Sequence, residues 1–173
     1  MGLPALWGIA GVVALLANAI YRLTPYALEL AELSLGTVEL VALVGWIALN
    51  AYSEGYRGFQ RMFSPRVVAR AQALDADPRP WLVVLAPLYC MGLVHATRKR
   101  LIISWVLTLA IVAIVVVVRR LDQPWRGIID AGVVVGLAWG AISIVYFAAR
   151  SVAGHTMPVS PDLPPQAAQA DQR

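Results

Sequence analysis

Charge is scarce in this sequence. Only 14% of its 173 residues are charged, whereas 60% are hydrophobic. Soluble domains carry charge on about a quarter of their residues, and a chain this poor in polar side chains has too few to cover a surface exposed to water. The composition therefore excludes an ordinary soluble globule and predicts a single membrane domain.

Cysteine, histidine and lysine are also nearly absent. A lone cysteine, Cys90, excludes an intrachain disulfide, and two histidines, His95 and His155, are too few to hold zinc or to anchor a haem. Lys99 is the one lysine, so the other basic residues are arginines. They flank apolar runs, where membrane proteins meet lipid phosphates, and no nucleic-acid-binding motif accompanies them. We expect no metal, no cofactor and no nucleic-acid partner.

The apolar residues come in long runs, which are the signal of membrane helices. The sequence predicts an all-α, polytopic helical bundle with spans at residues 3–21, 34–52, 81–97, 101–118 and 126–149. The run 81–97 is short and contains Pro87, so it either crosses or dips into the bilayer and returns. Hydropathy favours five spans, the distribution of arginines favours four, and the orientation stays open. No Lys or Arg precedes the first run, so we expect a retained helix and no cleaved signal peptide.

Residues 53–80 form the longest segment between spans. Aromatic side chains repeat along one side of it and arginines lie on another, which predicts a short amphipathic helix on the bilayer surface. Seven basic residues are expected to contact anionic headgroups, namely Arg57, Arg61, Arg66, Arg70, Arg98, Lys99 and Arg100. The tail, residues 151–173, consists largely of Pro, Ala and Gln, so we expect it to be disordered.

The second span carries the costliest polar groups. A capping hydroxyl and a proline at Thr24 and Pro25 predict the start of its helix, which places Glu39 and Asn50 on one face. A central acid costs roughly 2.5–3.5 kcal/mol and marks a functional site, although Glu39 near the boundary would reach water. Asp130 in the last span is a third candidate, either as a proton relay or as the ion-pair partner of an arginine one turn earlier.

Gly132, Gly136 and Gly140 repeat at a spacing of four in the last span, which lets another backbone approach closely. No nucleophile-base set or phosphate loop is visible. These features favour a non-catalytic packing or assembly component of a membrane complex, in a homo-oligomer or with partner subunits. The alternative is a small transporter or ion- or proton-conducting subunit that uses the Glu39–Asn50 face. We expect an integral protein of a cell (inner) membrane, with the lipid bilayer as its first partner.

Overall fold

The computed structural model describes residues 1–164, and every regular element among them is a helix. The elements are α1 (Leu3–Leu28), η1 (Glu29–Glu32), α2 (Thr37–Asn50), η2 (Ala51–Phe63), α3 (Ser64–Ala76), α4 (Pro80–Val84), α5 (Ala86–Cys90), α6 (Arg98–Val118) and α7 (Trp125–Val152). Helices α2, η2 and α3 follow one another without a break. They form one rod about 60 Å long at 1.5 Å per residue, which widens to a π-helix over η2.

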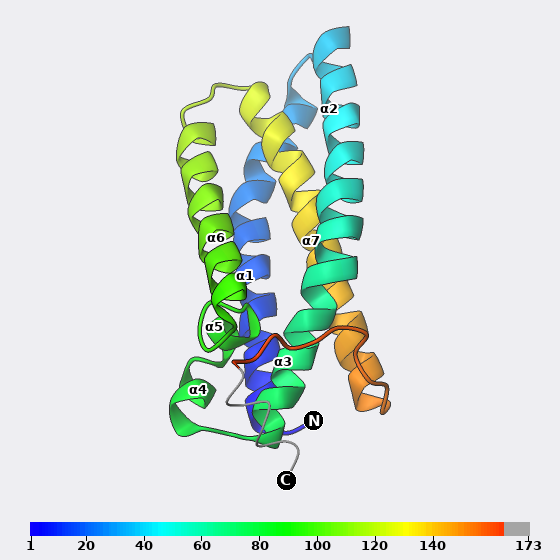
Figure 1. Ribbon diagram of the computed structural model, residues 1–173. Coiled ribbons are helices and arrows are strands. Elements are labelled where there is room, and N and C mark those ends of the chain that lie inside the picture. The colour runs from blue at the N-terminus through cyan, green and yellow to red at the C-terminus, as the bar shows by residue number, and fades with distance from the viewer. Residues whose placement is uncertain (165–173) are drawn as a thin grey trace.

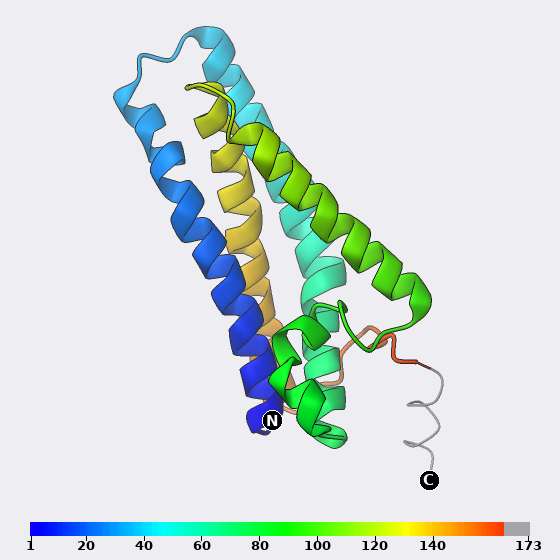
Figure 2. The ribbon, with the colours of Figure 1, turned by 90° about the vertical axis from the view of Figure 1, so that its left-hand side faces the viewer.

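Helix α7 lies between α1 and the rod and packs against both (Figure 1). Helix α6 belongs less closely to this group. It starts near α5 and crosses the bundle obliquely, as Figure 2 shows, and it makes no extensive contact with another helix among the described residues. The molecule is therefore a three-helix bundle of α1, α7 and the rod, and α6 is a fourth long helix that crosses this bundle at an angle.

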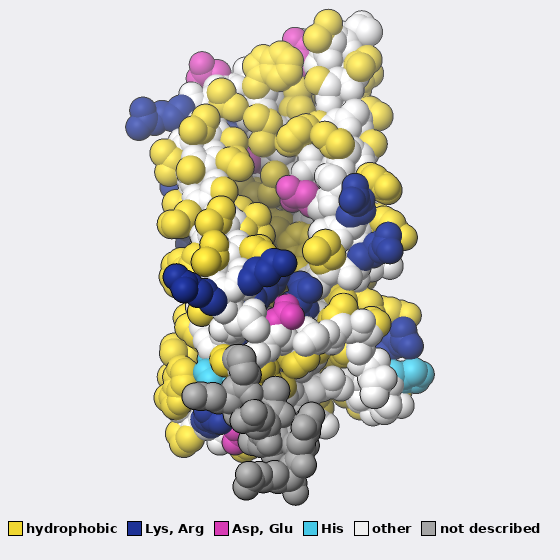
Figure 3. All heavy atoms as spheres, in the orientation of Figure 1, with side chains coloured by type: hydrophobic (Ala, Val, Ile, Leu, Met, Phe, Trp, Pro, Cys, Tyr) yellow, Lys and Arg dark blue, Asp and Glu magenta, His cyan; other side chains and the backbone are white. Residues whose placement is uncertain are grey.

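Three helices are long and apolar enough to cross a bilayer. They are α1 continued by η1, α6 and α7. The surface is also typical of a membrane protein, because apolar side chains cover most of the face that Figure 3 shows above the atoms drawn in grey. The chain is thus built as an all-helical membrane protein. The count of five spans is not confirmed.

The expected span over residues 81–97 folds differently. It consists of the two five-residue helices α4 and α5 and an irregular turn that leads into α6. Each short helix has a proline in its first turn, at Pro80 and Pro87. Proline lacks the N–H that a continuous helix needs, so it starts helices and interrupts longer ones. A five-residue helix is only about 8 Å long and cannot cross a bilayer by itself.

The start of the second helix also differs from the prediction. Thr24 and Pro25 do not begin a helix, because α1 runs through them to Leu28. The hydroxyl of Thr24 donates to the carbonyl of Ile20 at 2.7 Å, inside the same helix. The rod begins instead at Thr37, twelve residues after Pro25. The helix tolerates Pro25 and continues past it, and the N–H of Glu29 bonds to the Pro25 carbonyl, so the Thr-Pro pair is not a helix start here.

Residues 53–76 do not turn away from the bundle as expected of a surface helix. They extend the rod in line, and α3 buries its apolar side against the first turns of α1, the end of α7 and α5. The buried core lies at this end of the molecule, near the N-terminus. It comprises Ala5, Ile9, Val12, Val67, Val68, Ala71, Leu74, Leu82, Ala86, Tyr89, Cys90, Ile144 and Phe147.

Residues 153–164, here called the strap, correct the expectation of a tail disordered from residue 151. Helix α7 continues to Val152, and the strap then runs back across the core end of the molecule (Figure 1). The amide of Thr97 donates to the carbonyl of Asp162 at 2.9 Å, and Met157 and Leu163 pack against the core. The rest of the expected disorder falls on residues 165–173, which lie outside the described residues.

Candidate functional site

The polar face of α2 packs against the glycine row of α7. Asn50 is only 3% exposed, and its side-chain amide donates to the carbonyl of Trp46, one turn earlier, at 2.9 Å. A Cβ atom added to Gly132 would lie 2.9 Å from the Asn50 amide nitrogen. The indole of Trp46 crosses to α7 and donates to the carbonyl of Ile129 at 3.2 Å. Asn50 therefore serves as packing between two helices of one chain.

Gly136 and Gly140 continue the same contact along the rod. A Cβ atom on Gly136 would lie 3.3 Å from Cβ of Glu54, and one on Gly140 would lie 2.5 Å from the Phe59 ring. All three glycines of the row are buried. The close backbone approach that small residues permit is thus used by the rod of the same chain.

Glu39 lies at an end of the bundle. It occupies the first turn of α2, beside a shallow depression that it shares with Gln123 and Pro124. A carboxylate in the first turn is favoured by the helix dipole. Asn50 is about 16 Å further along the rod. The structure therefore does not bring these two residues together in one site.

Asp130 is 3% exposed and faces away from the rod. Its Oδ2 atom lies 3.7 Å from Nε of Arg126, the residue one turn earlier, and has no hydrogen-bond partner among residues 1–164. The Arg126 guanidinium sits 3.4 Å above the ring of Tyr26 in α1. The ion-pair interpretation of Asp130 therefore holds, and the pair helps to join α7 to α1.

The basic residues expected at lipid headgroups fall into three groups. Four are exposed, namely Arg57, Arg61, Arg98 and Lys99. Arg66 and Arg100 are partly buried. Arg70 is fully buried, at 0% exposure, so its assignment to the headgroups is wrong.

Arg70 instead connects three segments. Its guanidinium donates to the carbonyls of Tyr89, Val94, His95 and Pro161, so α5, the turn before α6 and the strap all bond to it. It also stacks on the ring of Tyr89, with 4.2 Å from its central carbon to the ring centre. Burial lowers the pKa of Arg70, and the neighbouring Tyr89 opposes that shift. Five donors in a planar fork suit arginine to this task better than lysine.

A sequence signal for this role was present. Val67, Arg70 and Leu74 share one helical face, and the two apolar residues are buried beside the arginine. An arginine within an apolar stripe is expected to be buried and bonded. Asp162 had no such signal, because it lies in a low-complexity tail and its ion pair with Arg66 joins segments far apart in the sequence.

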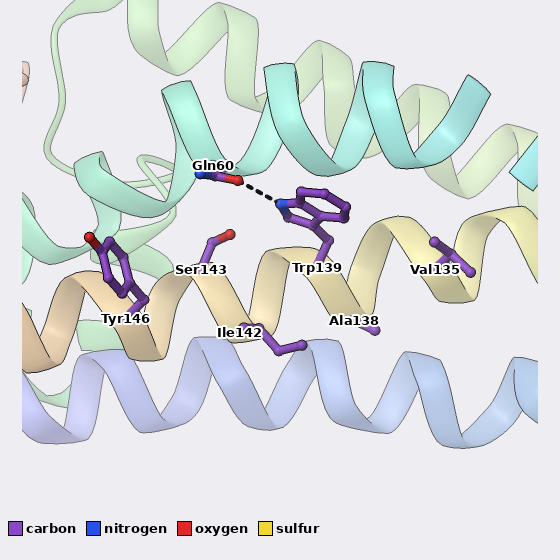
Figure 4. A pocket seen from close by; sticks show the side chains of 7 residues that line it. All are labelled: Gln60, Val135, Ala138, Trp139, Ile142, Ser143 and Tyr146. Carbon is purple, nitrogen blue, oxygen red and sulfur yellow. Dashed lines mark hydrogen bonds between the residues drawn. The ribbon is translucent and has the colours of Figure 1, made fainter. Parts of the chain in front are cut away.

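An apolar groove of about 490 Å³ opens along the outer side of α7 (Figure 4). It is lined by Gln60, Val135, Ala138, Trp139, Ile142, Ser143 and Tyr146. The Trp139 indole donates to the Gln60 side-chain oxygen at 2.8 Å across one edge. No acid or base lines this groove, so its chemistry suits a hydrocarbon chain and does not suggest a reaction.

No three His, Cys, Asp or Glu side chains within residues 1–164 gather closely enough to hold a metal ion. Comparison of the chain with protein-family models, with curated proteins and with solved structures finds no match. Any function must therefore be argued from the geometry above.

Proposed function

We propose that the protein is a non-catalytic assembly component of a membrane complex and that α6 is the helix through which it joins its partner. The observation that carries this proposal is the isolation of α6. It has the highest mean hydropathy of the candidate spans, 3.1, yet only 6% of its residues are buried within the chain. The other candidate spans are 22% and 39% buried.

The start of α6 is fixed, whereas the rest of the helix makes no extensive contact with another element of the described chain. Near its start, the Trp105 indole donates to the carbonyl of Leu93 at 3.1 Å and the Ser104 hydroxyl donates to that of Met91 at 3.4 Å. Beyond these contacts, most of the apolar side chains of α6 are exposed on the surface of the chain. In lipid, helices associate by close packing and not by the hydrophobic effect. A helix held in place but hardly packed therefore offers a preformed surface to another membrane helix.

The same proposal includes four spans, formed by α1, the upper part of the rod, α6 and α7. Both termini then lie on one side, together with α3, α4 and α5. Nine basic residues fall on that side, at residues 57–100 and at Arg150, and four fall on the other, at Arg22, Arg119, Arg120 and Arg126. The positive-inside rule therefore supports a cytoplasmic location for both termini.

Photo-crosslinking from α6 tests the proposed interface. A photoreactive amino acid at Val106, which is 61% exposed, should give one discrete protein adduct in native membranes. The matched control is Val41 on α2, which is 68% exposed and should react with lipid alone. An adduct of twice the chain's 18.7 kDa would identify a second copy, and another mass a different subunit. Only lipid adducts at Val106, or equal protein adducts at both positions, would contradict the proposal.

Proton conduction is a second candidate, supported by one observation. The buried Asp130 has a carboxylate oxygen without a hydrogen-bond partner in the described part of the chain, and buried acids of membrane helices mark proton paths. Against it, Asn50 and Glu39 do not join Asp130 in a continuous polar face. The variant Asp130→Asn in proteoliposomes decides the matter, since loss of a proton flux present in the parent protein would favour conduction over assembly.

A further inference from the structure

A cluster of arginines lies where the first turn of α6 meets α3. Arg66 belongs to α3 and Arg100 to α6, and Arg66, Arg70 and Asp162 all lie close enough to Arg100 for their charges to act on each other. The Nε atoms of both arginines are buried and have no hydrogen-bond partner among residues 1–164. Two neighbouring cations with unused donors repel each other unless an anion lies between them. The site is thus built for an anion.

In the structure the strap supplies a carboxylate that forms an ion pair with Arg66 and none with Arg100. Oδ2 of Asp162 lies 3.0 Å from Nε of Arg66, although the N–H is not aligned for a hydrogen bond. Figure 3 shows Lys and Arg side chains gathered around a single acidic side chain on this face. A carboxylate offers two oxygens in one plane, whereas a phosphate group offers more oxygens to the same arginines.

The strap is held at this point by few contacts. Asp162 has a φ of 51°, a left-handed conformation that residues other than glycine rarely adopt. Two hydrogen bonds fix the backbone on either side, from Thr97 to the Asp162 carbonyl at 2.9 Å and from Arg70 to the Pro161 carbonyl at 2.6 Å. The strap has no regular secondary structure. Its removal from the arginines would break these two hydrogen bonds, the ion pair with Arg66 and the packing of Leu163 against the core.

We propose that Arg66 and Arg100 form a phosphate-binding site and that Asp162 is a tethered substitute for the phosphate. A phosphate-bearing anion then competes with the strap for the two arginines. Its source is either the phosphodiester of an anionic lipid or free phosphate, since the recognising chemistry is the same. Exposed Arg98 and Lys99 lie two residues and one residue before Arg100 and add positive charge at the entrance.

Native mass spectrometry of the full-length protein in detergent tests this competition. The variant Asp162→Asn should retain at least about fivefold more phosphatidylglycerol than the parent chain, and equal retention of phosphatidylglycerol by the two would overturn the proposal. The double variant Asp162→Asn with Arg66→Gln should lose this gain. The control is Asp77→Asn, which removes an exposed ion pair with Arg79 and should change nothing. Equal gains for phosphatidylcholine would equally overturn the proposal.

A second arm separates the two sources of phosphate. If inorganic phosphate at millimolar concentration displaces the retained lipid, the site recognises the phosphate group itself. If the lipid resists displacement, the site recognises the lipid.

Hydrogen exchange supplies a readout that needs no variant. In nanodiscs of phosphatidylglycerol, the Thr97 amide and the strap amides should exchange faster than in nanodiscs of phosphatidylcholine, because the strap is displaced. If the amides exchange at the same rate in both lipids, and if Asp162→Asn retains no more lipid than the parent chain, then the carboxylate merely neutralises the arginines.

Discussion

Arg70 is the single side chain on which the core end of the molecule depends most. Its guanidinium satisfies carbonyls of α5, of the turn before α6 and of the strap. Replacement by methionine keeps much of the volume but leaves these carbonyls without a donor. We predict that Arg70→Met lowers the free energy of unfolding by about 3 kcal/mol or more, since each buried unsatisfied group costs about 1–3 kcal/mol.

Reversible unfolding in mixed micelles with increasing SDS measures this change. The matched control is Arg57→Met, at an exposed position of η2, for which we expect a change within about 0.5 kcal/mol. Similar losses for the two variants would mean that Arg70 contributes little beyond its charge.

Cys90 provides a second prediction at the same scale. Burial raises the pKa of its thiol from 9.0 to about 12, and Arg70 opposes this shift. The thiolate is the reactive form, so at pH 8 its fraction should be about a thousandfold below that of an ordinary thiol. We predict that N-ethylmaleimide does not modify the folded protein at pH 8 and modifies it fully after unfolding in SDS. Because Cys90 is the one cysteine, intact-protein mass spectrometry reports the site directly, and rapid modification of the folded chain would refute its burial.

The sequence predicts contacts within one helix better than contacts between distant segments. The pairing of Asp130 with the arginine one turn earlier follows from local spacing. The burial of Arg70 and its bond to Pro161 depend on segments 91 residues apart. The apolar neighbours of Arg70 on its helix face indicate that it is buried, but local pattern carries no information on which distant carbonyl groups bond to it.

At the scale of the elements, the contact between the glycine row and the rod makes a sharp prediction. A Cβ atom on Gly132 would lie 2.6 Å from the Trp46 indole nitrogen, so Gly132→Ala must push α2 away from α7. We expect a loss of about 1–3 kcal/mol, the usual cost of overpacking a tight contact. The control is Gly45→Ala in α2, where nothing lies within 4 Å of the added atom.

Gly45→Ala should leave stability unchanged or raise it by up to about 1 kcal/mol, because alanine favours a helix over glycine. Both variants are compared by the SDS unfolding described above. If Gly132→Ala were tolerated as well as Gly45→Ala, the rod and α7 would not be in close contact.

The long apolar elements were predictable and the short ones were not. The runs 101–118 and 126–149 correspond to α6 and α7 within three residues at each end. Their length alone identifies them, because lipid requires about 20 apolar residues. The run 81–97 is equally apolar in parts, but in α4 and α5 only some of its side chains are buried by protein, namely Leu82, Ala86, Tyr89 and Cys90. Hydropathy does not distinguish burial in protein from burial in lipid, so it does not establish a fifth span, and residues 81–97 form two short helices in place of one long one.

At the scale of the whole molecule, the two ends differ in kind. One end holds the core, both short helices, the strap and most of the arginines, whereas the other consists of η1 and the connections at residues 33–36 and 119–124. This asymmetry agrees with the charge distribution used above for the orientation. Such a molecule would have a compact end in the cytoplasm and a thin bundle in the bilayer.

The number of spans, on which the orientation and the α6 interface both depend, can be measured by labelling in sealed vesicles. In a Cys90→Ala background, single cysteines are placed at four exposed positions, Ser34, Ala76, Asp122 and His155, and treated with a membrane-impermeant maleimide. Four spans predict that positions 34 and 122 react from one side and positions 76 and 155 from the other. If positions 34 and 122 react from opposite sides, five segments cross the membrane and the account is wrong.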